Sequence, residues 1–511
     1  MTKIKSFLRN HWGSILLWLM IILYIGYFSV FTILRYRTLY SSYFDLGIMH
    51  QTVFNTYRSI RSLDPSRFLE LTNPYGPQQI KRMAIHNDIL LAFIALFYFI
   101  YSGPETLLIL QTVVLAIGAW AVFKIGLIVL EKIRYKNVIA LLFAFSYLVY
   151  SPMQRANIFE FHAVTLSTTF LLFMFYFWLK KRHGWSFIFF LLSILSKEQV
   201  ALTTLFFGCY VLFRNLIQHK FKIKKIRQII FPVTIIFASV FWFLFSMTIV
   251  IPYFRGTNHF ALSYYADFGD SPFRIILGVL DNPRSIFKYI FHIDTLRYFF
   301  FLLGPLGFLS FFSPFQLLIA APEFGINLLS NNWNMRNIVY HYTSVIQPFV
   351  FISAIYGIKH LLGLTSKMRF NMQQIRKEKL FAFLLSLIIV CSAIIFAYFK
   401  GPLPFSKEKD IHPFLYPQKE KTDAAFWQNL LKNKRLKVSS TGQMAPFFAS
   451  RRYFYNFSQD YHLADYIVLR LTEIYNYPEK DTLIPVYEKL NKDKNYKMIY
   501  KNEDVEVYKK I

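Results

Sequence analysis

The chain has 511 residues, of which 55% are hydrophobic and 20% are aromatic, and this exceeds what the core of a soluble protein of this length requires. The formal net charge is +29, but the basic residues form short clusters between apolar stretches, which argues against nucleic acid as a partner and favours contact with anionic lipid. The two cysteines, Cys209 and Cys391, lie in apolar stretches, so neither a disulfide framework nor a cysteine-based metal site is expected.

Long apolar stretches recur along the chain, and each is a candidate membrane span because about 20 apolar residues cross roughly 30 Å of hydrocarbon. The first, 12–34, is too long for a signal-peptide core, so we expect it to remain as an anchor. The other candidates are 87–102, 105–130, 137–151, 163–179, 185–196, 199–213, 229–252, 296–312, 314–330, 342–363 and 380–399. The pattern predicts a polytopic α-helical membrane protein with about 11–13 transmembrane helices.

Clusters of basic residues predict the orientation of the chain in the cytoplasmic membrane. The positive-inside rule assigns to the cytoplasm Lys3/Lys5/Arg9, Lys180/Lys181/Arg182, the run 220–227 and the run 367–379. Alternation then assigns to the outer side 35–86, 152–162, 197–198, 253–295, 331–341 and 400–511. Three apolar stretches separate two outer segments, so one of them does not cross; the short candidates are 87–102 and 137–151.

The first outer loop and the tail differ in kind. Within 35–86, apolar residues recur at three and four positions from Tyr43 to Phe54, which predicts an amphipathic helix on the membrane face that begins near Asp45. The tail alternates polar turns with β-like runs at 436–439, 466–469 and 505–508. We therefore expect a transmembrane domain over 1–399 and a small α/β extracytoplasmic domain over 400–511.

Ionisable residues near a membrane are costly to bury and are commonly functional, so those at the outer face are the site candidates. Asp45 could be a functional carboxylate or an N-terminal helix cap. Glu160 and His162 stand two residues apart, and they point the same way only on an extended segment. There they could form a metal or acid/base unit, whereas interfacial snorkelling is the alternative.

Further candidates lie in or next to the apolar stretches. Lys197 could bind a phosphate as a point charge while Glu198 holds the lysine or a metal, although a tight turn between helices would have the same sequence. Glu323 lies inside an apolar stretch and needs a partner or a water-filled cavity. Histidines and basic residues complete the set: His50, His86, His341, Lys81 and Arg82. No Walker motif, nucleophile signature or zinc-protease motif occurs, which argues against ATP-driven chemistry.

Taken together, several short segments resemble a bacterial and archaeal membrane family called domain of unknown function 2079. The resemblance covers most of the chain and is weakest in 215–295. It rests on Phe44-Asp45-Leu46-Gly47, His86, Phe159-Glu160-Phe161-His162, Lys197-Glu198 and Pro322-Glu323, and in the tail on Ser439, Ser440, Pro446, Arg451, Arg452, Tyr455 and Ala464-Asp465-Tyr466.

This resemblance implies a GT-C-like fold, related to the protein mannosyltransferases and aminoarabinose transferases, and a sugar donor linked to a lipid phosphate. In those enzymes an acidic residue of the first outer loop lies at the active site, and by position it maps onto Asp45. The loop has no Asp-Glu or Asp-x-Asp pair, so a divalent metal is possible but not demanded, and the cofactor is left open.

The resulting hypothesis is a glycosyltransferase that moves a hexose or pentose from a polyprenyl-phosphate donor to a glycan, lipid or protein acceptor at the outer face. Asp45 would act as the general base, and Glu160, His162 or Glu323 would orient it. Lys197 would hold the lipid phosphate together with Lys81 and Arg82. His86, Glu198, Glu323 and His341 are assigned to substrate binding.

Two other classes of protein remain in competition. A transporter or lipid flippase of the cell envelope also has many spans and buried charges, but it predicts two related halves or charges along a path through the membrane. Neither is evident in the sequence, whose candidate residues gather at one face. A noncatalytic scaffold for envelope assembly explains the tail but gives no reason for Asp45 or Glu323.

Overall fold

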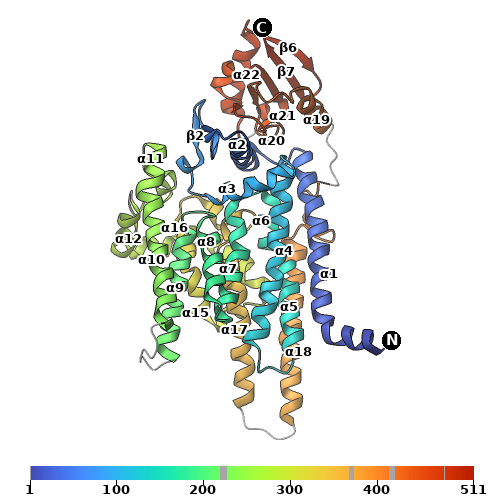
Figure 1. The fold of residues 1–511 in the computed structure, drawn as a ribbon, viewed down its shortest axis with the longest axis vertical. Helices are drawn as coiled ribbons and strands as arrows, with labels where there is room; N and C mark the ends of the chain where they lie inside the picture. Colours follow the sequence, from blue (N-terminus) through green and yellow to red (C-terminus); the bar gives the residue numbers. More distant parts are fainter. Residues whose placement is uncertain (1, 219–226, 368–372, 414–419, 477) are drawn as a thin grey trace.

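The computed structural model describes residues 2–218, 227–367, 373–413, 420–476 and 478–511. A long helical bundle carries a small sheet domain at one end (Figure 1). The ends of α17 (Gln347–Lys367) and α18 (Gln373–Lys400) that are nearest in sequence lie at the opposite end. α1 (Thr2–Arg37) runs from that half of the molecule up to the sheet domain.

Six helical stretches within the described residues are long and apolar enough to cross a membrane. They comprise α1, α4 (Pro104–Val129), α5 (Lys136–Leu148) continued by α6 (Ser151–Phe159), α9 (Val200–Gln218), α10 (Arg227–Phe245) continued by η5 (Ser246–Val250) and α11 (Ile251–Arg255), and α18. Shorter apolar helices include α7 (Ala163–Leu179) and α8 (His183–Ile194). The polytopic helical architecture is confirmed, while the total of 11–13 crossings stays a prediction.

The stretch 87–102 forms helices too short to cross a membrane. It forms α3 (Leu90–Ile94) and the 3-10 helix η4 (Ala95–Phe99), and this apolar helix of 90–99 reaches about 15 Å, roughly half of the hydrocarbon thickness. It lies at the sheet-domain end of the bundle (Figure 1). By contrast, α5 and α6 together form a candidate span of 24 residues, so the predicted orientation, which requires an even number of crossings here, stays a prediction.

One predicted span is interrupted, whereas the next is continuous. The stretch 296–312 forms α14 (Ile293–Leu303), η7 (Gly304–Leu306) and η8 (Leu309–Phe312). The break falls at Gly307, whose φ of 59° ends the helix. The stretch 314–330 forms one apolar helix, Pro314–Leu329, in which α15 (Pro314–Leu317), the 3-10 turn η9 (Leu318–Ala320) and α16 (Ala321–Leu329) follow one another without a gap.

The amphipathic helix of the first outer loop is confirmed, but it extends further than predicted. A π-helical turn η1 (Tyr43–Gly47) continues as α2 (Ile48–Ser62), and the loop ends in an antiparallel pair, β1 (Glu70–Thr72) and β2 (Gln79–Lys81). α2 is buried on most sides. It packs between the bundle and the sheet domain, so it does not lie on the membrane face as an exposed helix would.

The C-terminal domain is confirmed as α/β. Its five-stranded sheet has the order β4 (Phe454–Asn456), β3 (Val438–Ser440), β5 (Tyr466–Arg470), β7 (Val505–Lys510), β6 (Tyr496–Lys501). β3 pairs in parallel with β4 and β5, while β7 is antiparallel to both of its neighbours. The helices are α19 (Glu420–Leu430), α20 (Ala445–Phe448), α21 (Leu471–Tyr475) and α22 (Lys480–Lys492).

The sheet domain shares one hydrophobic core with the first outer loop, which includes Phe54 and Leu71 on one side and Phe447 and Val468 on the other. Polar contacts add to it. His50 Nε2 lies 2.7 Å from Ser450 Oγ, and Arg452 Nε donates to Glu70 Oε2 at 2.9 Å. The domain therefore fixes the loop from which Asp45 projects.

The charge clusters that predict orientation fall partly on residues beyond this description. Residues 219–226 and 368–372 lie outside the described residues, and they include most of the 220–227 run and part of the 367–379 run. The side chains of Lys3, Lys5 and Arg9 also lie outside it. Which end of the bundle faces the cytoplasm stays a prediction.

Candidate active site

A cavity of about 700 Å³ is lined by residues of the first outer loop and of the helical bundle, and by none of the described residues of the C-terminal domain. Figure 1 shows the elements that bear these residues at the end of the bundle that carries the sheet domain. The cavity walls come from η1 and α2, the β1–β2 region, the start of α7, the α8–α9 turn and the segments after α11 and α16. Six predicted site residues line it: Asp45, Arg82, His86, His162, Lys197 and His341. Positions far apart in the sequence are thereby brought together at one face, as the sequence predicted.

Asp45 and His162 form a direct pair at the cavity wall. His162 Nε2 lies 2.9 Å from Asp45 Oδ1, and the Asp45 side chain is 27% exposed. The His162 ring stacks on that of His341 with 3.8 Å between centroids, and its buried Nδ1 has no hydrogen-bond partner within the described residues. The imidazole therefore orients a carboxylate that can still reach a molecule in the cavity.

Glu160 supports the Asp45 turn without lining the cavity. Its two carboxylate oxygens accept the backbone N–H groups of Ser42 at 2.8 Å and Leu46 at 2.6 Å. Burial, together with the charge of Asp45, raises the pKa of Glu160 well above its usual range, although these two N–H groups oppose the shift. The capping role considered for Asp45 is thus performed by Glu160.

Glu160 and His162 lie between α6 and α7, so their segment is not helical. This is the condition under which the two side chains could have formed one acid/base unit. The Glu160 backbone has φ of 148°, a conformation that costs free energy for a residue with a Cβ. Gln111 holds it, since its Nε2 donates to the Glu160 carbonyl at 2.8 Å and its Oε1 accepts from His162 N at 3.0 Å. The two side chains contact different partners, however, so they do not form one acid/base unit.

The predicted basic residues differ in how free their charges are. Arg82 is buried and donates from Nε and Nη2 to both carboxylate oxygens of Asp88, at 2.8–3.0 Å. Lys81 does not line the cavity, and its Nζ donates to the carbonyls of Ser66 and Phe68 at 2.6 and 2.7 Å. The structure therefore brings Arg82 but not Lys81 to the cavity, and the charge of Arg82 is already compensated.

Lys197 and Arg255 are cavity cations without an ion pair among the described residues, although Arg255 donates to the Ala84 carbonyl. The Lys197 ammonium makes no hydrogen bond or salt bridge with the part of the chain that the structure describes, and burial lowers its pKa. Glu323 is 1% exposed and accepts from Gln199 Nε2 at 2.6 Å, while its Oε2 has no hydrogen-bond partner among the described residues. Gln199 lines the cavity and Glu323 does not, so Glu323 is connected to the cavity through its hydrogen bond with Gln199.

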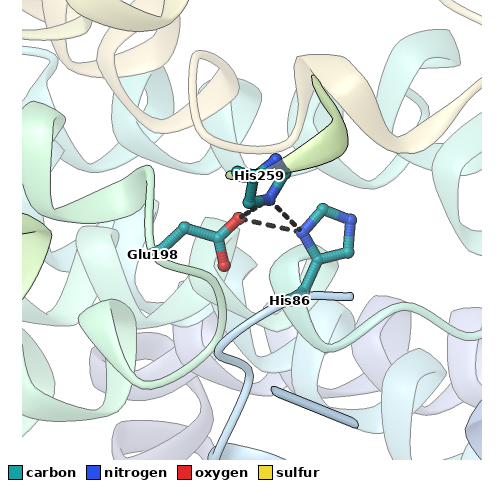
Figure 2. Close-up of side chains that lie close together, drawn as sticks. All are labelled: His86, Glu198 and His259. Atoms are coloured by element: carbon teal, nitrogen blue, oxygen red, sulfur yellow. Dashed lines mark hydrogen bonds and ion pairs between the residues drawn. The ribbon is translucent and has the colours of Figure 1, made fainter. Parts of the chain in front are cut away.

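His86 and Glu198 meet a third residue, His259, which the sequence did not single out (Figure 2). Glu198 Oε1 lies 2.8 Å from His86 Nδ1 and 3.2 Å from His259 Nε2. Burial lowers the pKa of His86 to about 3, so a neutral imidazole contacts the carboxylate through a hydrogen bond. Listing every ionisable residue of the outer segment 253–295 would have included His259.

Two solved structures align with most of this chain. The oligosaccharyltransferase of Archaeoglobus fulgidus in its apo form aligns over 95% of this chain and 73% of its own, with a TM-score of 0.50 and 11% sequence identity. ArnT of Cupriavidus metallidurans bound to undecaprenyl phosphate aligns over 91% of this chain and 93% of its own, with a TM-score of 0.48 and 11% identity. At 11% identity, the alignment with the oligosaccharyltransferase establishes only that this chain has a GT-C-like fold.

No curated protein matches the sequence. A family model described as predicted membrane protein (DUF2079) matches residues 35–507, a range that includes the first outer loop, every cavity residue described above and nearly all of the C-terminal domain. The chain therefore belongs to the DUF2079 family of predicted membrane proteins.

Proposed function

We propose that the protein is an integral-membrane glycosyltransferase that moves a sugar from a polyprenyl-phosphate donor to an acceptor at the outer face of the cytoplasmic membrane. The observation that carries this proposal is a single cavity lined both by a carboxylate held by an imidazole, Asp45, and by an unpaired ammonium, Lys197. The fold shared with an oligosaccharyltransferase supports it.

The two groups suit the two halves of glycosyl transfer. Asp45 accepts the proton of an acceptor hydroxyl or amide as the acceptor atom attacks the anomeric carbon of the donor. The bond between that carbon and the phosphate oxygen breaks, and polyprenyl phosphate leaves with the electron pair. This leaving group needs positive charge more than a proton, and Lys197 supplies it.

The surrounding residues act through these two. His162 orients the Asp45 carboxylate by its hydrogen bond, and Glu160 fixes the turn on which Asp45 stands. The cavity of about 700 Å³ falls within the usual range for small-ligand sites, so a sugar phosphate fits. The lipid chain would lie along the lipid-facing helices, and the acceptor, a glycan, lipid or protein, would enter beside the C-terminal domain.

The test measures sugar transfer by the purified protein in lipid vesicles supplied with radiolabelled polyprenyl-phosphate hexoses. We expect Asp45→Asn to lower turnover by about 10²–10⁴-fold, because the amide cannot accept the proton. Asp270→Asn serves as the matched control, since that side chain is 73% exposed and contacts only the exposed Arg274 in the structure as described. Full activity of Asp45→Asn in a folded protein would refute the mechanism.

The same preparation separates the transporter alternative. If the wild-type protein moves the labelled lipid between the two leaflets but releases no sugar from it, the protein is a flippase and the transferase proposal fails.

A further inference from the structure

His86, Glu198 and His259 bring three possible ligand atoms together at the cavity wall (Figure 2). Besides the two contacts of Glu198 Oε1, the ring nitrogens His86 Nδ1 and His259 Nε2 lie 3.3 Å from each other. The three residues come from the segment before α3, the α8–α9 turn and the segment after α11, so the fold and not local sequence gathers them. Within the described ranges no other three His, Cys, Asp or Glu side chains form such a group.

The spacing matches the coordination shell of a small divalent ion. Tetrahedral Zn²⁺ with bonds of about 2.0–2.1 Å to nitrogen and oxygen has ligand atoms about 3.3–3.4 Å apart. The separations of 3.2 and 3.3 Å lie at or slightly below that length, and the separation of 2.8 Å between His86 Nδ1 and Glu198 Oε1 is about 0.5 Å shorter. For most of the three pairs, the two ligand atoms need to move apart by only a few tenths of an ångström to bind an ion.

Backbone N–H groups contact two of the three residues, and only the Asn87 contact is compatible with a bound ion. Asn87 N–H donates to Glu198 Oε2 at 2.9 Å, which leaves Oε1 directed at the imidazoles. Ala261 N–H donates to His259 Nδ1 at 3.0 Å, which places the proton of a neutral His259 on Nε2. A metal on Nε2 moves that proton to Nδ1, so binding opens the Ala261 hydrogen bond.

We propose that His86, Glu198 and His259 bind a divalent transition-metal ion of the Zn²⁺ type, with an open coordination position toward the cavity that takes a phosphate oxygen. Two imidazoles and one carboxylate suit Zn²⁺, and three protein ligands leave a fourth position free. Both histidines line the cavity together with Lys197, so a phosphate held by that lysine reaches the ion. The phosphate ligand rests on the proposed function, whereas metal binding does not.

The experiment measures metal content and the visible spectrum of the purified full chain, stripped of metal and reloaded with one equivalent of Zn²⁺ or Co²⁺. We expect one tightly held ion per chain and a Co²⁺ spectrum typical of four-coordinate sites. His259→Ala and Glu198→Gln should weaken binding by on the order of 100-fold or more. His259→Cys should retain the ion and add a sulfur-to-cobalt charge-transfer band. A cysteine that only replaced the hydrogen bond of His259 to Glu198 would not produce this band.

Two controls locate the ion. His462→Ala, at an exposed histidine of the C-terminal domain, and Asp45→Asn should both keep it. A wild-type chain that holds no ion, or an ion lost in Asp45→Asn but kept in His259→Ala, overturns the proposed site.

Inorganic phosphate tests the open position separately. It should shift the Co²⁺ spectrum of the wild type, and an unchanged spectrum overturns that part of the proposal. A metal-loaded protein that transfers no sugar refutes the proposed function and leaves the metal site standing.

Discussion

At Glu160 the carboxylate acts through hydrogen bonds to backbone and not through contact with a ligand. Both of its oxygens are used by the turn that carries Asp45, and its own backbone is held in a costly conformation by Gln111. A strained residue is retained where its position matters, which suggests that the exact placement of the Asp45 turn is what this site requires.

We expect Glu160→Gln to lower kcat by roughly 10- to 100-fold with little change in KM. One carboxylate oxygen becomes an NH₂ group that faces a backbone N–H, so the turn shifts and the free energy of unfolding falls by about 1–3 kcal/mol. Steady-state kinetics and thermal unfolding measure the two effects. Asp45→Asn is the comparison, because it should lower turnover by about 10²–10⁴-fold while leaving unfolding nearly unchanged. Wild-type kinetics in Glu160→Gln would contradict the positioning role.

Lys197 and Lys81 allow a paired test of the phosphate-binding role. Lys197→Met should raise the KM for the donor by about 10- to 100-fold, because a charge-assisted hydrogen bond contributes about 1.5–3 kcal/mol. Lys81→Met should leave that KM unchanged, since the Lys81 ammonium is bound to backbone carbonyls away from the cavity. Equal effects of the two substitutions would show that general surface charge, and not Lys197, attracts the donor.

Among the elements, the junction of β3 and α21 contains a buried carboxyl group that makes the C-terminal domain sensitive to pH. Glu473 Oε2 accepts from Gln443 N at 2.8 Å, but its buried Oε1 has no hydrogen-bond partner in the described parts of the chain. Burial raises the pKa of Glu473 from its ordinary value of 4.5 to about 7. The folded domain therefore holds this proton more tightly than the unfolded chain does.

It follows that the contribution of Glu473 to stability is complete below about pH 4.5 and is lost as the pH rises through about 7, a loss of about 3 kcal/mol at most. Glu473→Gln should remove this dependence. Hydrogen exchange of the β5 amides in the full chain at pH 5 and pH 8, corrected for intrinsic rates, measures it. Glu488→Gln on α22, an exposed position, should keep the wild-type dependence, and the same dependence in Glu473→Gln would contradict the assignment.

The sequence predicted elements well where one physical signal dominates. The length of the apolar stretches located α1, α4 and α18. The β-like runs located β5 and β7, and for these two strands both ends agree to within two residues. The prediction failed after α14, where apolar composition continues through Gly307 although the helix does not. Hydropathy measures burial, and this break depends on backbone geometry.

On the scale of the whole molecule, the side of the membrane that each end faces is a testable prediction. In a chain with Cys209 and Cys391 replaced by Ala, a cysteine at Lys494 should react with a membrane-impermeant maleimide in intact cells. A cysteine at Lys132, in the α4–α5 connection at the other end of the bundle, should react only after lysis. Both positions are exposed. The reverse pattern would place the cavity on the cytoplasmic side and refute an outer-face reaction.

The candidate site was predictable in part because its residue types are costly in a membrane. That cost pointed to Asp45, His162 and Lys197, which the fold brings to one cavity. It could not separate Lys81, which is bound to carbonyls, from Arg82, which is paired with Asp88. His259 was missed because its partners lie more than fifty residues away, and no local pattern encodes such a meeting.

The core shared by the first outer loop and the C-terminal domain has a consequence for biosynthesis. Phe54 and Leu71 are synthesised early, but they share a core with Val468 and Val507. At about 5–20 residues per second, the ribosome adds these two valines on the order of tens of seconds later. During that interval the loop that carries Asp45 lacks most of its support. The site is therefore assembled only when translation is nearly complete, and a chain arrested before β7 should be inserted in the membrane yet inactive.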